Sequence, residues 1–177
     1  MSYETTVRPE WIDYNGHMTD AAYAVLCAEA SEAFLAAVDL SADYQAATGR
    51  TTYTVESHIY YLREAVEGDV VTVETVIVDS DSKRLRLGHT LRTASGEIAR
   101  AELLYLHVNQ RTGRVEPFPE DRQRRLTKIA TSSDEHAGLA ARVVHDQVGH
   151  LDAVDPGLPQ RTTPPPVAPA EHPTRQP

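Results

Sequence analysis

The sequence predicts an α+β domain in which an antiparallel sheet wraps around one long central helix. Residues 18–38 are rich in Ala and Leu and have few polar breaks, and a helix that is apolar nearly all round is typically buried. Residues 51–109 contain four strand-like segments joined by tight turns, a pattern that indicates an antiparallel meander. An open sheet with helices on one face is the alternative arrangement.

The predicted helix over residues 18–38 repeats apolar side chains at the helical period. Ala22, Leu26 and Ala30 recur every four residues, which places them on one face of the helix. Cys27, the single cysteine, lies inside the same segment. We therefore predict that its thiol is a small core group and not a nucleophile.

Four strands are predicted after the helix. They cover residues 51–62, 69–78, 83–93 and 97–109. Each segment is rich in β-branched or aromatic residues or alternates apolar with polar side chains, and Gly, Asp and Ser supply turn chemistry between the segments. At ~3.3 Å per residue, a strand of about 12 residues is ~40 Å long, which is long enough to curl around the helix.

Size and charge exclude several classes of function. A chain of 177 residues can bury a sizeable single core. The 17 Lys and Arg against 26 Asp and Glu give a net charge of −9, which argues against a general nucleic-acid-binding protein. No apolar run approaches the ~20 residues of a membrane span, and the chain does not begin with a signal-peptide pattern. With one cysteine, we expect a cytoplasmic protein without a membrane partner.

Composition also divides the chain. The folded domain is predicted over residues 1–130, followed by a weakly helical extension over residues 131–154. Eight of the 11 prolines fall in residues 155–177, and this stretch offers too little apolar surface to offset its ordering entropy. We predict a disordered Pro-rich tail there, with polyproline docking to a partner as the alternative.

The most informative stretch is PEWIDYNGHM, residues 9–18, immediately before the predicted helix. It places the carboxylate of Asp13, the amide of Asn15 and the imidazole of His17 within five residues. A carboxylate can attack a carbonyl carbon or deprotonate a water molecule, and the chain contains no G-x-S-x-G serine motif. The structural alternative is that Asp13 and Asn15 only form a turn.

On these residues the chain resembles the hot-dog acyl-CoA thioesterases of the 4-hydroxybenzoyl-CoA thioesterase type. Their D-x-N-x-H-x-N-x-x-Y pattern is matched by Asp13, Asn15, His17 and Tyr23, while Thr19 stands where Asn is usual. Within this family, the P-E-W-I-D-Y-N-G-H-M run and a T-V-E-x-H strand are most similar to the betainyl-CoA thioesterases of carnitine breakdown.

The resemblance covers roughly residues 5–130 and implies a hot-dog fold that hydrolyses a small acyl-CoA to the free acid and CoA. Coenzyme A is then part of the substrate, and no other cofactor is expected. Asp13 is the implied nucleophile or general base. Asn15 and His17 are expected to orient the thioester or assist proton transfer, and backbone amides near Gly16 and Met18 to bind the oxyanion. A homodimer or higher homo-oligomer with sites between subunits is also implied.

Two groups of residues are predicted to bind the substrate. Aromatic ring faces and a negative charge suit a quaternary ammonium acyl group; the candidates are Trp11, Tyr14, Tyr23, Tyr53, Glu56 and Tyr60. Basic side chains suit the phosphates of coenzyme A; the candidates are Arg63, Lys83, Arg84 and Arg86. Ordinary strand packing and a charged edge that deters aggregation are the alternatives.

Other interpretations stay open. Glu29 or Glu32 on the helix can take the role of the catalytic carboxylate, and the acyl group can be a short aliphatic or aromatic chain. A hot-dog dehydratase and a non-catalytic acyl-CoA-binding module are the competing functions. A metal site is not predicted, because His145 and His150 lack the spacing that places two ligands on one helical turn.

Overall fold

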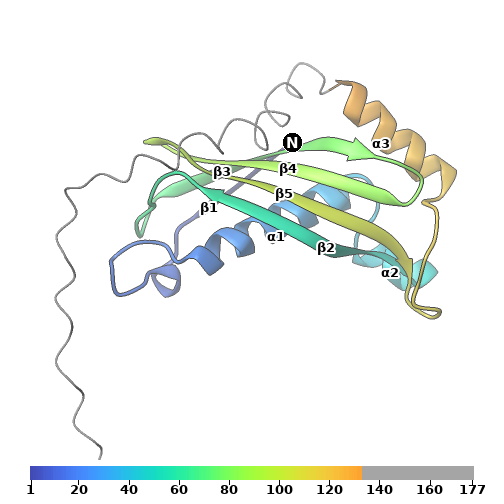
Figure 1. Cartoon of the computed structure of the whole chain (residues 1–177), viewed down its shortest axis with the longest axis horizontal. Helices are drawn as coiled ribbons and strands as arrows, with labels where there is room; N and C mark the ends of the chain where they lie inside the picture. Colours follow the sequence, from blue (N-terminus) through green and yellow to red (C-terminus); the bar gives the residue numbers. More distant parts are fainter. Residues whose placement is uncertain (133–177) are drawn as a thin grey trace, which may run out of the picture. The chain divides into compact units, whose positions relative to one another are not determined.

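The computed structural model describes residues 1–132 and shows one curled antiparallel sheet with a long helix against its concave face (Figure 1). The elements in chain order are β1 (Ser2–Thr6), the 3-10 helix η1 (Pro9–Trp11), α1 (Asp20–Ala37), α2 (Ala42–Thr48), β2 (Arg50–Tyr61), β3 (Val70–Ser80), β4 (Arg84–Thr93), β5 (Gly96–Asn109), β6 (Arg114–Val115) and α3 (Glu120–Ser132). The predicted α+β arrangement, a sheet wrapped around one central helix, is confirmed.

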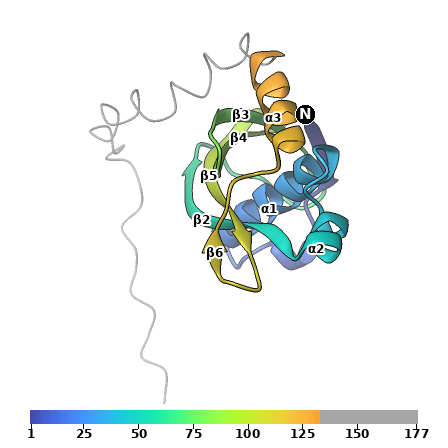
Figure 2. The same ribbon diagram turned by 90° about the vertical axis from the view of Figure 1, so that its right-hand side faces the viewer.

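The strands follow the order β1-β3-β4-β5-β2, and β6 pairs with β5. All pairings are antiparallel, and β3, β4 and β5 form a meander. The prediction of a four-strand meander is wrong for its first strand, because β2 pairs with β5 and not with β3. The long strand β2 therefore lies at the edge of the sheet. Viewed from one end, the sheet curls around α1 without enclosing it (Figure 2).

Five elements of the fold were not predicted from the sequence, namely β1, η1, α2, β6 and α3. Strand β1 adds to β3, helix α2 follows α1, and helix α3 closes the described part of the chain. Arg122 and Arg125 of α3 both pair with the carboxylate of Asp39, just past the end of α1. The predicted tail, and the predicted extension from residue 133 onward, lie outside the described residues.

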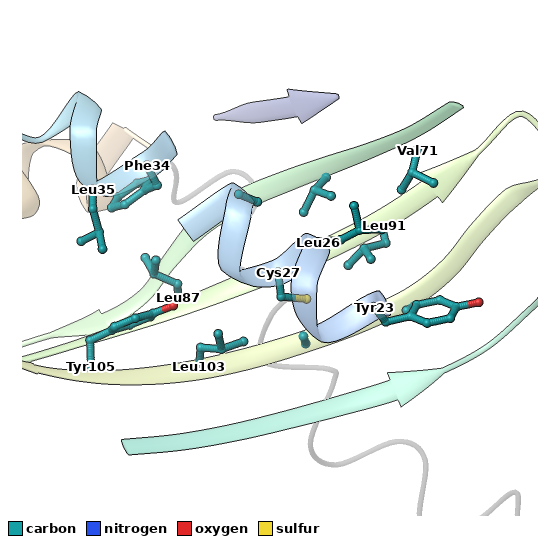
Figure 3. Packing of buried hydrophobic residues seen from close by; sticks show 14 of the residues in the cluster. Tyr23, Leu26, Cys27, Phe34, Leu35, Val71, Leu87, Leu91, Leu103 and Tyr105 are labelled. Carbon is teal, nitrogen blue, oxygen red and sulfur yellow. The ribbon is translucent and has the colours of Figure 1, made fainter. Parts of the chain in front are cut away.

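Helix α1 supplies the centre of the core. Leu26 and Cys27 are fully buried and point from α1 toward Leu87, Leu91 and Leu103 of the sheet (Figure 3). Burial raises the pKa of the Cys27 thiol to about 12, so the predicted core role of this cysteine is confirmed.

One face of α1 is not covered, contrary to the expectation of a helix buried all round. Ala24, Val25, Ala28 and Glu32 are exposed on it, and Val25 keeps 42% of its accessible surface. The physical reason is that the sheet curls only part of the way around the helix. Among the described residues no single helix is long and apolar enough to cross a membrane. Helices α1 and α2, bent by 60° where they join, reach the required length and apolar composition only when they are counted as one segment.

A buried histidine bonds α1 to the sheet. His89 of β4 is 2% exposed, and its Nε2 lies 3.0 Å from Ser31 Oγ while its Nδ1 lies 3.0 Å from Thr75 Oγ1. The Ser31 hydroxyl donates to the Cys27 carbonyl, so it accepts from Nε2–H, and Nδ1 accepts from Thr75. Burial lowers the pKa of His89 to about 4 because the charged form has no water around it.

This histidine should make the fold sensitive to mild acid. The unfolded chain takes up a proton on His89 near its ordinary pKa of 6.5, whereas the folded chain does so only near 4. The free energy of unfolding should therefore fall by roughly 3 kcal/mol from this group as pH drops from 6.5 to 4. Denaturant titrations across this range should show a shallower fall for His89→Gln. The exposed His58→Gln control should keep the wild-type slope; a wild-type slope in His89→Gln would contradict the prediction.

Candidate functional site

The motif before α1 forms a tight hairpin loop. Asp13 N–H donates to the His17 carbonyl and Gly16 N–H donates to the Asp13 carbonyl, both at 3.0 Å, while Ile12 and Met18 form an isolated bridge below the loop. Gly16 has a φ of +82°, a conformation that side chains disfavour. The glycine of the motif therefore closes the turn, and the turn fixes the position of Asp13.

Asn15 holds the Asp13 carboxylate. Asp13 Oδ1 accepts the Asn15 backbone N–H at 2.7 Å, and Oδ2 accepts the Asn15 side-chain amide at 2.8 Å. The side-chain hydrogen bond is the main reason that the pKa of Asp13 lies below its usual range, and the Asn15 backbone N–H adds to it. The carboxylate is ionised at neutral pH and can act as a base or as a nucleophile.

The predicted oxyanion donors are already used within the chain. Gly16 N–H is bound to Asp13, and Met18 N–H donates to the Ala65 carbonyl at 2.8 Å. Thr19 N–H donates to the Trp11 carbonyl at 2.8 Å, so α1 begins at Asp20 and not at residue 18. The assignment of Gly16 and Met18 as oxyanion donors is therefore wrong for this chain conformation.

A shallow pocket of about 560 Å³ lies beside the loop. We call it the loop pocket; its lining residues are Met18, Asp20, Tyr23, Tyr61, Leu62, Arg63 and Glu64. His17 connects it to the loop, because His17 Nε2 lies 3.3 Å from a carboxylate oxygen of Glu64. Tyr23 donates to the Arg63 carbonyl at 3.0 Å and meets Tyr61 edge to face. The structure thus brings His17 and Tyr23 to the same end of α1 as Asp13.

A second pocket of about 570 Å³ lies at the other end of the helix, between α1, α2 and the start of β2. We call it the α1–β2 pocket. Its walls include Ala28, Glu32 and Leu35 of α1, Tyr53 of β2 and Tyr105 of β5. Sequence reasoning named Glu32 and Tyr53 separately but missed this pocket, because its walls come from segments far apart in the chain.

The predicted aromatic set does not form one cluster in the chain. Trp11 is buried under the Arg8 guanidinium, 4.6 Å from its ring centroid, and Tyr14 is 92% exposed. Tyr60 lies in register with Arg100 and lines neither pocket. A single chain therefore does not bring these aromatic candidates into one pocket, and their contact with the acyl group stays a prediction.

Glu56 also lies away from both pockets. It pairs with His58 at 2.7 Å and lies 4.0 Å from Arg86, in register with Leu104 of β5. Glu56 lines neither the loop pocket nor the α1–β2 pocket. Within the single chain the Glu56 carboxylate belongs to an ion-pair network on the sheet, and its contact with an acyl group or a neighbouring subunit stays a prediction.

The four basic candidates are not gathered into one patch. Arg63 donates to the Ser95 carbonyl at the β4–β5 turn, whereas Lys83 lies at the β3–β4 turn, at the other end of β4. Arg84 pairs with Asp81. Arg86 pairs with Glu102 at 3.4 Å. Ion pairs within the sheet therefore occupy Arg84 and Arg86. The alternative of a charged edge is wrong for them, because β4 lies between β3 and β5.

Glu29, the alternative catalytic carboxylate, already has two partners within the fold. It accepts a hydrogen bond from the Tyr3 hydroxyl at 2.7 Å and lies 3.6 Å from the Arg8 guanidinium. It lines neither pocket. The alternative metal residues His145 and His150 lie outside the described residues.

Comparison with known proteins identifies the family. The sequence profile of the thioesterase-like superfamily matches residues 7–126. The chain belongs to this superfamily. The resemblance seen in the sequence is thereby confirmed, and the superfamily match covers the hairpin loop and strands β2 to β6.

Individual relatives agree with the family. A betainyl-CoA thioesterase of Pseudomonas aeruginosa is 37% identical over 88% of this chain and 95% of the relative. An L-carnitine dehydrogenase/betainyl-CoA thioesterase of Agrobacterium fabrum is 39% identical over 80% of this chain, which spans only 30% of that longer protein. A Staphylococcus aureus protein solved in complex with CoA is 34% identical, with a TM-score of 0.71 over 73% of this chain and 83% of the other.

The loop geometry makes a prediction about Asp13 that does not depend on activity. Asn15→Ala removes the side-chain hydrogen bond that contributes most to the lowered pKa of Asp13, so the pKa of Asp13 should rise. Carbon NMR titration of the carboxyl groups measures this directly. Asp81 is an internal reference, because its pKa is lowered by hydrogen bonds from Lys83 and Arg84 in a different turn. An unchanged Asp13 titration in Asn15→Ala would contradict the assignment.

Proposed function

We propose that this protein is an acyl-CoA thioesterase with betainyl-CoA as its substrate and Asp13 as the catalytic carboxylate. The observation that carries the proposal is the hydrogen-bonded, ionised Asp13 at the start of α1, in a chain that belongs to the thioesterase-like superfamily. Relatives named betainyl-CoA thioesterase support the acyl group. The name of the Agrobacterium relative, which includes L-carnitine dehydrogenase, supports a role in carnitine metabolism.

In the proposed reaction, the thioester carbonyl carbon gains an oxygen from water and loses the sulfur of coenzyme A. As a general base, Asp13 takes a proton from the attacking water, and this proton ends on the departing thiolate. As a nucleophile, Asp13 forms a mixed anhydride and releases the thiolate, and water then cleaves the anhydride to regenerate the carboxylate. Both routes need the carboxylate in its ionised form, which the hydrogen bonds from Asn15 favour.

We also propose that the active form is a homodimer. Strand β2 is an uncovered sheet edge on which Tyr53 and Val55 remain 47% and 52% exposed, and the neighbouring face of α1 exposes Ala24 and Val25. Antiparallel pairing of two β2 strands would continue the sheet and cover both features.

The direction of this pairing determines what each subunit contributes. The Tyr61 end of β2 adjoins the loop pocket, and the Arg50 end adjoins the α1–β2 pocket. In an antiparallel pair, the Tyr61 end of one strand meets the Arg50 end of the other. The Asp13 loop of one subunit would therefore face the α1–β2 pocket of its partner, giving two composite sites.

Asp13→Asn is the direct test of the proposed activity. It keeps the shape of the side chain but removes its charge, so kcat should fall at least ~100-fold, the usual scale for losing a positioned base. CoA release is followed with a thiol-trapping dye, and thermal unfolding checks the fold. Asp81→Asn is the matched control, because it makes the same change in another exposed turn and should keep the wild-type rate. A wild-type kcat in Asp13→Asn would overturn the role of Asp13, and no CoA release by the wild type would favour a binding module.

A further inference from the structure

We propose that the α1–β2 pocket binds the cationic end of the acyl group, with Glu32 supplying the negative charge and Tyr53 and Tyr105 the aromatic walls. This assignment rests on the proposed thioesterase function and adds the residues that select its substrate.

The pocket has the chemistry that a quaternary ammonium requires. Its walls combine apolar side chains such as Leu35 and Leu40 with two tyrosines, and Glu32 is the single charged residue among those that line it. A trimethylammonium group cannot donate a hydrogen bond, so it is held by ring faces and by a negative potential. No basic residue lines the pocket within the described chain, so nothing there repels a cation.

Glu32 carries a charge that the fold does not use. Its side chain is exposed, and within residues 1–132 no hydrogen bond or ion pair engages it. Glu29, one turn earlier on the same helix, is held by Tyr3 and Arg8. Glu64, at the loop pocket, is paired with His17. Of these three carboxylates, Glu32 is the one without a hydrogen-bond or ion-pair partner in residues 1–132, and it lies in the pocket with the tyrosines.

A chain of side-chain hydrogen bonds holds the ring of Tyr53 in place. Its hydroxyl accepts a hydrogen bond from Gln110 Nε2 at 3.2 Å, and Gln110 Oε1 accepts one from Gln45 Nε2 at 2.7 Å. This chain runs from α2, through the residue that follows β5, to β2. Tyr105 is 4% exposed, and burial raises the pKa of its hydroxyl, so it remains a neutral ring. Both rings are positioned before the substrate arrives.

The length of α1 requires the pocket to work with the Asp13 of a second copy. Glu32 follows the first residue of α1, Asp20, by 12 residues, which is ~18 Å along the helix axis. In a betainyl group a single methylene separates the ammonium from the thioester carbonyl. One chain therefore cannot present its own Asp13 to the carbonyl and its own Glu32 to the ammonium, whereas the proposed antiparallel dimer brings these groups together from two chains.

The test compares betainyl-CoA with 3,3-dimethylbutyryl-CoA, in which carbon replaces the charged nitrogen. Wild-type kcat/KM should favour betainyl-CoA at least ~10-fold, equivalent to about 1.4 kcal/mol. Glu32→Gln should lower kcat/KM for betainyl-CoA ~10-fold and leave the neutral substrate unchanged, because only the charge is lost. Tyr53→Leu should lower the value for betainyl-CoA ~5-fold through loss of a ring face.

Asp43→Asn is the matched control. It removes the same charge from α2, next to the pocket, at a residue that does not line it, and it should leave both substrates unchanged. Hydrolysis of both substrates with the betainyl preference intact in Glu32→Gln would overturn the pocket assignment and leave the thioesterase function standing. Release of CoA from neither substrate by the wild type would overturn the thioesterase function and the assignment that rests on it.

Discussion

Partial enclosure of α1 by the sheet is the constraint on which the rest of the structure depends. An apolar helix must be buried, and the curled sheet covers the face that carries Leu26 and Cys27. The Ser31–His89–Thr75 hydrogen bonds fix the helix against β3 and β4. Because the sheet stops at β2, a second face of the helix stays exposed beside an unpaired strand edge. Apolar surface and free backbone groups next to each other favour association with another copy.

The same helix separates the two halves of the candidate site. At its beginning, the hairpin loop holds an ionised carboxylate in a turn closed by Gly16. In its second half, the α1–β2 pocket offers Glu32, Tyr53 and Tyr105 without a basic residue among its lining side chains. Neither half is sufficient for a short acyl group, because the helix is too long for one chain to bring both to the same molecule. A complete site, with both the catalytic carboxylate and the residues that select the substrate, would then form only between two subunits.

What the sequence predicts well is local. The helix, the β3–β4–β5 meander and the Asp13–Asn15 turn depend on residues close together in the chain, so local sequence patterns predict them. What it misses depends on distant contacts. Met18 N–H is taken by Ala65, and a bulge between Thr54 and Glu56 breaks the alternation assumed for β2.

The candidate site shows the same division. The α1–β2 pocket joins Glu32, Tyr53 and Tyr105, residues that no spacing rule connects.

The central claim is that two chains build each site, and mixing two defective variants tests it most directly. Asp13→Asn lacks the carboxylate and Glu32→Arg places a repelling charge in the pocket, so each variant alone should hydrolyse betainyl-CoA poorly. A mixed dimer of these chains contains one site with both residues intact. Random exchange should therefore restore about a quarter of wild-type activity. Activity that stays at the mean of the two parent variants would contradict a composite site.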